Sequence, residues 1–118
     1  MNQRTALVAM TANDGVWDFD ADTKRSTLSR RWKSMLGYDL DDDDVLLDWY
    51  ALVHPSDMSR VQVKMREHLA GKSDFFESVH RMRHQNGDWR WMSSRAKAVL
   101  DEKGRLLRLL GVEVDITE

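Results

Sequence analysis

The sequence from Phe75 to Glu118 reads FFESVHRMRHQNGDWRWMSSRAKAVLDEKGRLLRLLGVEVDITE. Two turn signals divide it, QNGD at 85–88 and DEKG at 101–104. Asn-Gly favours a tight hairpin because both residues tolerate positive φ, and a glycine at the end of DEKG suits the left-handed position of a longer loop. The stretch therefore predicts a meander of three antiparallel strands, at about residues 76–84, 89–99 and 105–115.

The composition fits a single domain of balanced charge. The chain has 118 residues, with 18 Lys and Arg against 20 Asp and Glu. This balance gives no global field that would attract nucleic acid or an anionic membrane. No apolar run approaches the ~20 residues of a membrane span. The absence of cysteine excludes disulfides and thiolate metal sites, and it fits a cytoplasmic protein.

The sequence ahead of the meander predicts two further strands and a capped helix. Residues 16–20 (VWDFD) alternate in polarity, and residues 25–28 (RSTL) form a second short strand after a turn. Ser29 suits the N-cap of a helix over residues 30–36, and Gly37 suits its C-terminal end.

Two more helices are expected in the middle of the chain. Residues 45–53 (VLLDWYALV) are apolar enough for a short buried helix, and Pro55 suits the first turn of a longer helix over residues 56–69. We therefore expect an α+β domain, with a five-stranded antiparallel sheet and helices packed on one face. The longer helix carries one apolar stripe, formed by Met58, Val61, Met65 and Leu69.

The acidic run at residues 39–44 is interpreted as a solvated loop. It holds five acids in six residues, but it lacks the mid-loop glycine and distal glutamate of a calcium-binding EF-hand. We therefore expect no metal site. The chain also lacks a nucleophile–base motif, an HExxH helix and a phosphate-binding loop, so we expect no catalysis by this chain alone.

Seven short motifs, in order and at matching spacing, resemble a PAS domain with its C-terminal PAC motif. The resemblance covers nearly the whole chain, and we take residues 13–118 as the PAS/PAC sensor domain and residues 1–12 as an N-terminal helical cap. The motifs are GVWD at 15–18, MLGY at 35–38, HPSD at 54–57, FE at 76–77 with RMRHQNG at 81–87, WRW at 89–91, DEKGR at 101–105 and GVEVDITE at 111–118.

The resemblance implies a fold and a role. The two N-terminal strands would sit at the centre of the sheet beside the last strand, with a cavity between sheet and helices. The domain would sense a signal and regulate a covalently attached effector, either a histidine kinase or a diguanylate cyclase with a GGDEF domain, often as a dimer. The signal would leave through Asp115, Ile116, Thr117 and Glu118.

The period of two along a strand predicts which side chains line that cavity. Arg81 and Arg83 belong in water, so the opposite row should face inward, and it includes Ser78 and His80. Either these two groups bond each other, the backbone or water, or they orient a polar small-molecule ligand. The full set of pocket candidates is Phe76, Ser78, His80, Met82, Met58, Val61, Met65, Met92 and Ser94.

The same phasing places Trp89 and Trp91 on the outer face of the sheet, where they need a cover. The cover would be the N-terminal segment with Leu7, Val8 and Met10, from the same chain or from the second chain of a homodimer. A homodimer through this face is the preferred hypothesis. The alternative function is a ligand-free dimerisation or protein-interaction module.

The absence of cysteine excludes a cysteinyl-flavin adduct and a thioester-linked chromophore. We expect no tightly bound cofactor, with haem and a non-covalent flavin as alternatives. The axial ligand of a haem would be His68, although this residue is better interpreted as a half-exposed group at a helix end. His54 is interpreted as structural, in the turn before the long helix.

Overall fold

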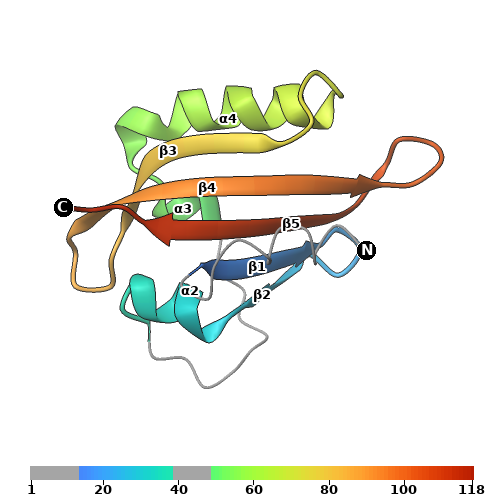
Figure 1. Ribbon diagram of the computed structural model, residues 1–118. Coiled ribbons are helices and arrows are strands. Elements are labelled where there is room, and N and C mark those ends of the chain that lie inside the picture. Colours follow the sequence, from blue (N-terminus) through green and yellow to red (C-terminus); the bar gives the residue numbers. More distant parts are fainter. Residues whose placement is uncertain (1–13, 39–48) are drawn as a thin grey trace.

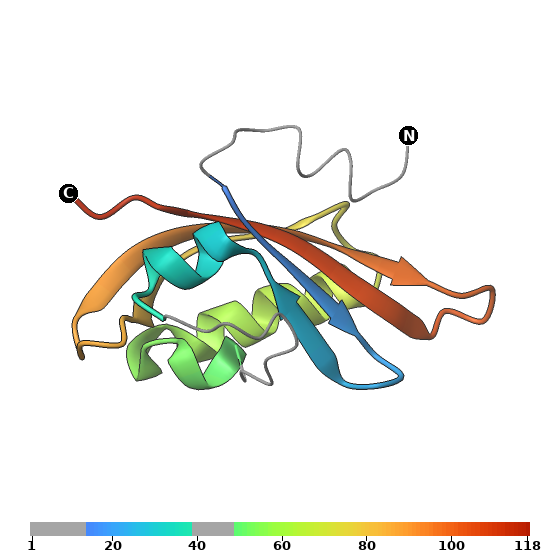
Figure 2. The ribbon, with the colours of Figure 1, turned by 90° about the horizontal axis from the view of Figure 1, so that it is seen from below.

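A computed structural model describes residues 14–38 and 49–118 as a five-stranded sheet with helices on one of its faces (Figures 1 and 2). The predicted fold class is confirmed. In chain order the elements are β1 (Gly15–Asp20), β2 (Arg25–Leu28), α2 (Arg30–Met35), α3 (Trp49–Leu52), α4 (Pro55–Leu69), β3 (Phe76–Arg83), β4 (Trp89–Leu100) and β5 (Leu106–Asp115). Within the described ranges, no helix is both long and apolar enough to cross a membrane.

The strand order is β2-β1-β5-β4-β3, with antiparallel pairing throughout. One expectation was wrong here: β1 lies inside the sheet beside β5, but β2 is an edge strand. The reason is that β2 has only four residues, and β1 is the one strand to which it is bonded. β5 occupies the middle of the sheet, so it can connect the core to the C-terminus.

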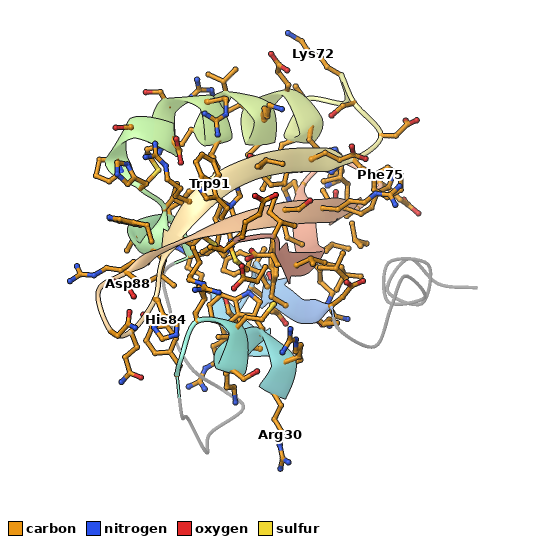
Figure 3. The ribbon with its side chains drawn as sticks, turned by 60° about the vertical axis from the view of Figure 1, so that its left-hand side comes forward. Arg30, Lys72, Phe75, His84, Asp88 and Trp91 are labelled. Atoms are coloured by element: carbon orange, nitrogen blue, oxygen red, sulfur yellow. The ribbon has the colours of Figure 1, made fainter. Side chains whose placement is uncertain are left out.

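The predicted elements end within two residues of the observed ones. Ser29 caps α2 by accepting a hydrogen bond from the N–H of Trp32, and Gly37 follows with φ of 77°. A Cβ at Gly37 would also overlap the ring of His84, which lies at the hairpin between β3 and β4 (Figure 3). Of the helix expected at 45–53, only Trp49–Leu52 lies in the described part. The acidic run at 39–44 and the N-terminal cap lie outside it.

The core forms between the inner face of the sheet and the helices. Its fully buried members include Trp32 on α2, Val61 on α4 and Met92 on β4. Gly111 on β5 is opposite Trp17 on β1, and a Cβ at this position would overlap the indole ring. The glycine therefore allows the large ring to lie flat against β5.

The edge of the sheet at β3 is occupied by side chains from α4, which runs alongside it (Figure 1). Arg60 donates to the backbone carbonyl of Val79, and Lys64 donates to that of Glu77. Asp57 accepts the backbone N–H of Arg81 at 2.9 Å and also binds the Arg81 guanidinium at 2.9 and 3.0 Å. These bonds satisfy backbone groups that an edge strand would otherwise present to other chains.

Candidate functional site

The predicted inward row of β3 does face the core. Phe76, Ser78, His80 and Met82 are buried, as are Val61, Met65, Met92 and Ser94 from the neighbouring elements, whereas Met58 is half-buried. The structure therefore brings the predicted pocket candidates together on one surface.

The polar members of this row bond one another. The Ser78 hydroxyl lies 2.8 Å from Nδ1 of His80, and the Ser94 hydroxyl lies 3.5 Å from its Nε2. Burial lowers the pKa of His80 to about 4, while the Asp57 carboxylate raises this pKa by a smaller amount and the Arg60 guanidinium lowers it slightly further. The imidazole is therefore neutral at physiological pH and links β3 to β4.

Glu113 on β5 is the functional candidate that the sequence-based selection missed. Its side chain is completely buried on the inner face, opposite Ser94 of β4 and Gly15 of β1. Burial raises its pKa to about 7, although Trp49, Ser94 and Trp32 act in the opposite direction. A buried carboxyl in an otherwise apolar strand is costly unless it is satisfied, so Glu113 marks a polar centre in the core.

Trp49, the first residue of α3, is the ring at the middle of this centre. Its indole N–H donates to Oε1 of Glu113. The ring stacks against Trp17 at 6.0 Å and meets Phe76 and His80 edge-on at 6.1 and 5.1 Å. The helical layer is thus joined to β1, β3 and β5 through one side chain.

Three buried polar atoms around Glu113 and Trp49 have no hydrogen-bond partner among the described residues: Oε2 of Glu113 and the indole nitrogens of Trp17 and Trp32. Trp32 and Ser94 lie near enough to lower the pKa of Glu113. We call Ser78, His80, Ser94, Glu113, Trp49, Trp32 and Trp17 the core polar cluster. Unsatisfied buried groups are rare in folded proteins and point to bound water, a ligand or a titratable role.

The fold and the sequence can now be compared with known proteins. A family model described as PAS fold matches residues 25–113.

The chain belongs to the PAS fold family.

PAS domains are sensory modules, and the similar proteins carry them in signalling enzymes. The chain is 29% identical over 114 residues to a blue-light-activated histidine kinase from Brucella anthropi, covering 94% of this chain and 22% of that protein. The chain therefore spans about a fifth of this curated relative.

Solved structures agree with the family. A sensory box histidine kinase/response regulator from Burkholderia thailandensis E264 superposes with a TM-score of 0.82 at 30% identity, covering 98% of this chain and 86% of that one. The N-terminal domain of a diguanylate cyclase with PAS/PAC sensor from Marinobacter aquaeolei gives a TM-score of 0.72 at 22% identity, covering 88% and 95%. The second likeness supports the fold alone.

His68 does not suit the role of a haem ligand. His68 is buried, not half-exposed as expected, because the turn after α4 folds back over it. The N–H of Ala98 donates to its Nε2 at 2.9 Å, so Nδ1 carries the proton and donates to the Ser73 carbonyl at 2.9 Å. Neither nitrogen is available to a haem iron. In the described ranges, no group of three or more His, Asp or Glu could hold a metal.

Aromatic rings fill part of the described core. The Trp49 indole packs against Trp17 at 6.0 Å and meets Phe76 edge-on at 6.1 Å. The chain lacks the cysteine that a flavin adduct needs, so of the two flavin modes only a non-covalent one is open to this sequence.

The C-terminal exit is fastened to the start of β4. Asp115 binds the Arg90 guanidinium at 2.9 Å and accepts the N–H of Thr117 at 2.9 Å. The Thr117 hydroxyl accepts the backbone N–H of Trp91 at 2.8 Å, and the N–H of Ile116 donates to the Trp91 carbonyl at 2.8 Å. Asp115 and Thr117 thus hold the end of β5 against the start of β4. Glu118 is exposed.

The outer face of the sheet carries the two predicted tryptophans. Trp89 is 39% exposed and Trp91 is 42% exposed, and Figure 3 labels Trp91. Arg81 lies over the Trp91 ring at 5.1 Å, and the His54 ring lies 4.5 Å from that of Trp89. His54 also caps α4 by accepting the N–H of Ser56, so its structural interpretation fits. Asp57, in the first turn of α4, binds Arg81 through its carboxylate.

Proposed function

We propose that this chain is a sensory input domain that regulates a covalently attached effector through Asp115, Ile116, Thr117 and Glu118. One observation carries the proposal. Glu113 of the core polar cluster and Asp115 of the exit are two residues apart on β5. A change in the bonding of Glu113 would therefore act directly on the strand whose end is fastened to Arg90 and Thr117.

The named relatives support the choice of effector. A histidine kinase or a diguanylate cyclase with a GGDEF domain would follow the exit, and the whole protein would act in the cytoplasm. The chain itself would not be catalytic. Its signal would be a small polar molecule or ion that contacts the pocket candidates, with Ser78, His80 and Ser94 supplying hydrogen bonds.

The sensory role predicts that Ser78→Ala alters effector output in the longer protein. The substitution removes the partner of Nδ1 of His80, so the buried imidazole must rebond. Effector activity would be measured over the range of conditions to which the protein responds. Ser93→Ala is the matched control because Ser93 lies on the outer face of β4, one residue from Ser94. Unchanged output in Ser78→Ala would contradict the proposal.

A second candidate function, a ligand-free dimerisation module, is favoured by the exposed Trp89 and Trp91. Large apolar side chains gathered on one face commonly mark an interface. In this proposal, two copies associate through the outer face of the sheet, with Leu7, Val8 and Met10 of the N-terminal cap contributing to the contact.

Trp91→Lys is expected to raise the dimer dissociation constant by about 30-fold or more, the usual effect of losing a central tryptophan. Sedimentation velocity over a concentration series would measure it. Val63→Lys is the control, because Val63 is equally exposed, at 42%, but lies on α4. A wild type that stays monomeric at high micromolar concentration, or a variant with unchanged association, would contradict dimerisation through this face.

A further inference from the structure

The carboxyl of Glu113 has a bonding pattern that depends on one proton. Oε1 accepts the Trp49 indole N–H, and Oε2 has no hydrogen-bond partner among the described residues. A carboxylate would need further donors at Oε2, whereas a protonated carboxyl would itself donate from that atom. The Ser94 hydroxyl, directly across on β4, can donate or accept, so it can serve both forms.

Among the described residues, the groups that act on Glu113 carry no charge. They are Ser94 on β4, Trp32 on α2 and Trp49 on α3, and Gly15 on β1 lies opposite Glu113. Trp49 in turn touches His80 on β3 and Tyr50 on α3. The groups that lower its pKa are all neutral donors, and His80 itself is neutral.

The buried charged residues that neighbour these positions in sequence, Asp14 and Lys33, are not among the groups that shift the pKa of Glu113. Asp57 and Arg60, from α4, act electrostatically on His80 but not on Glu113. The energy of the carboxyl is therefore dominated by its burial.

We propose that Glu113 is a proton-binding site of the sensor core, and that gain or loss of one proton changes its hydrogen bonds to Trp49 and Ser94. This inference rests on the proposed sensory function and names the proton as one signal read by the same cluster. In the protonated form, the carboxyl donates to Ser94 and holds Trp49 by a neutral bond. In the ionised form, it needs both donors and strengthens its bond to Trp49.

The consequence for the fold lies at α3. Trp49 begins this helix and touches Trp17, Phe76 and His80. A change in the strength of the hydrogen bond from Trp49 to Glu113 therefore acts on α3 and on β5 together. Because β5 continues to Asp115, the proton site and the exit share one strand.

The test follows the indole N–H signals of the ¹⁵N-labelled chain by NMR between pH 5.5 and 8.5, with Trp49 assigned through Trp49→Phe. The Trp49 signal is expected to follow a one-proton titration with a midpoint near neutral pH. In Glu113→Gln, which resembles the protonated carboxyl in shape and charge, this titration should vanish. A Trp49 signal that does not move in the wild type, or that still titrates in Glu113→Gln, overturns the proposal.

Ser94→Ala keeps the proposal testable if Glu113→Gln fails to fold. Ser94 bonds both forms, but its bond to the charged carboxylate is the stronger one. Its loss therefore destabilises the ionised form more, so the midpoint should rise by about 0.5–1 pH unit. Ser93→Ala, on the opposite face, should leave it unchanged. An unchanged midpoint in Ser94→Ala counts against the proposed bonding.

The two proposals fail separately. If the Trp49 signal titrates as expected but effector output is unchanged in Ser78→Ala, the sensory role is contradicted and the proton site still stands. An absent titration would remove the proton site whatever the effector does.

Discussion

Glu113→Gln is expected to make the stability of the domain rise with pH, and His80→Gln is expected to make it fall. Glu113 has its pKa raised by burial from 4.5 to about 7. Between these values the folded state holds a proton that the unfolded state has lost, so stability decreases as pH rises. The total effect is about 3 kcal/mol, at about 1.4 kcal/mol per pKa unit.

His80 has the opposite sign. Burial lowers its pKa from 6.5 to about 4. Between these values the unfolded state binds a proton that the folded state does not bind. Stability therefore increases as pH rises, again by about 3 kcal/mol in total. From pH 4.5 to 6.5 the two contributions to the free energy of unfolding cancel in the wild type. Each single variant keeps only the pH dependence of the other residue.

Urea unfolding at half-unit steps from pH 4.5 to 7 would measure both slopes. Over two pH units the free energies of unfolding of the two variants should diverge by about 5 kcal/mol. Asp57 does not interfere, because its pKa is lowered by its hydrogen bond to Arg81 and its contribution is lost only below its ordinary value of 3.8. If the free energy of unfolding changed with pH in the same way in both variants, the expected pKa differences between the folded and unfolded chains would be contradicted.

The second large effect is expected at the exit. In the longer protein, the double variant Asp115→Ala, Thr117→Ala should hold the effector at one activity while the domain still folds. The double substitution removes the Arg90 bond at 2.9 Å and the Trp91 N–H bond at 2.8 Å. At about 1 kcal/mol for a typical hydrogen bond and somewhat more for a charged one, the loss is smaller than the usual stability of a domain.

Effector output with and without stimulus, together with thermal unfolding of the isolated chain, would check this expectation. Asp101→Ala is the control. Asp101 accepts the N–H groups of Lys103 and Arg105 at 2.9 and 2.8 Å in the turn at the opposite end of β5. The Asp101→Ala variant should lose a comparable amount of stability and still regulate the effector. Intact regulation in the double variant would contradict signal transmission through Asp115 and Thr117.

The meander and the inner row of β3 could be predicted because their signals are local. Asn86-Gly87 fixes one turn, and the charged Arg81 and Arg83 fix the phase of the strand. The same alternation correctly placed Ser78 and His80 inside, and a bond between them was one of the alternatives left open.

Glu113 was missed because its strand is buried on both faces. Alternation in GVEVD assigns the apolar Val112 to the core and the carboxyl to water. In the fold, Val112 and Leu110 are buried on the outer face, so the inner face takes Glu113 instead. The place of Trp49 depends on contacts with strands far away in sequence, which a local pattern does not contain. His68 was misjudged for the same reason, since its two partners lie in a later turn and on β4.

The occupied edge at β3 limits how copies of this chain can assemble. A free edge strand permits open-ended growth, because each added chain offers the next edge. Here the carbonyls of Glu77 and Val79 are already bonded to Lys64 and Arg60, and the opposite edge, β2, has four residues. Contact through the broad face of the sheet would instead use the same surface on both partners, which closes after two copies. Under the proposed dimerisation through the outer face, the fold therefore favours a self-limiting pair over a fibre.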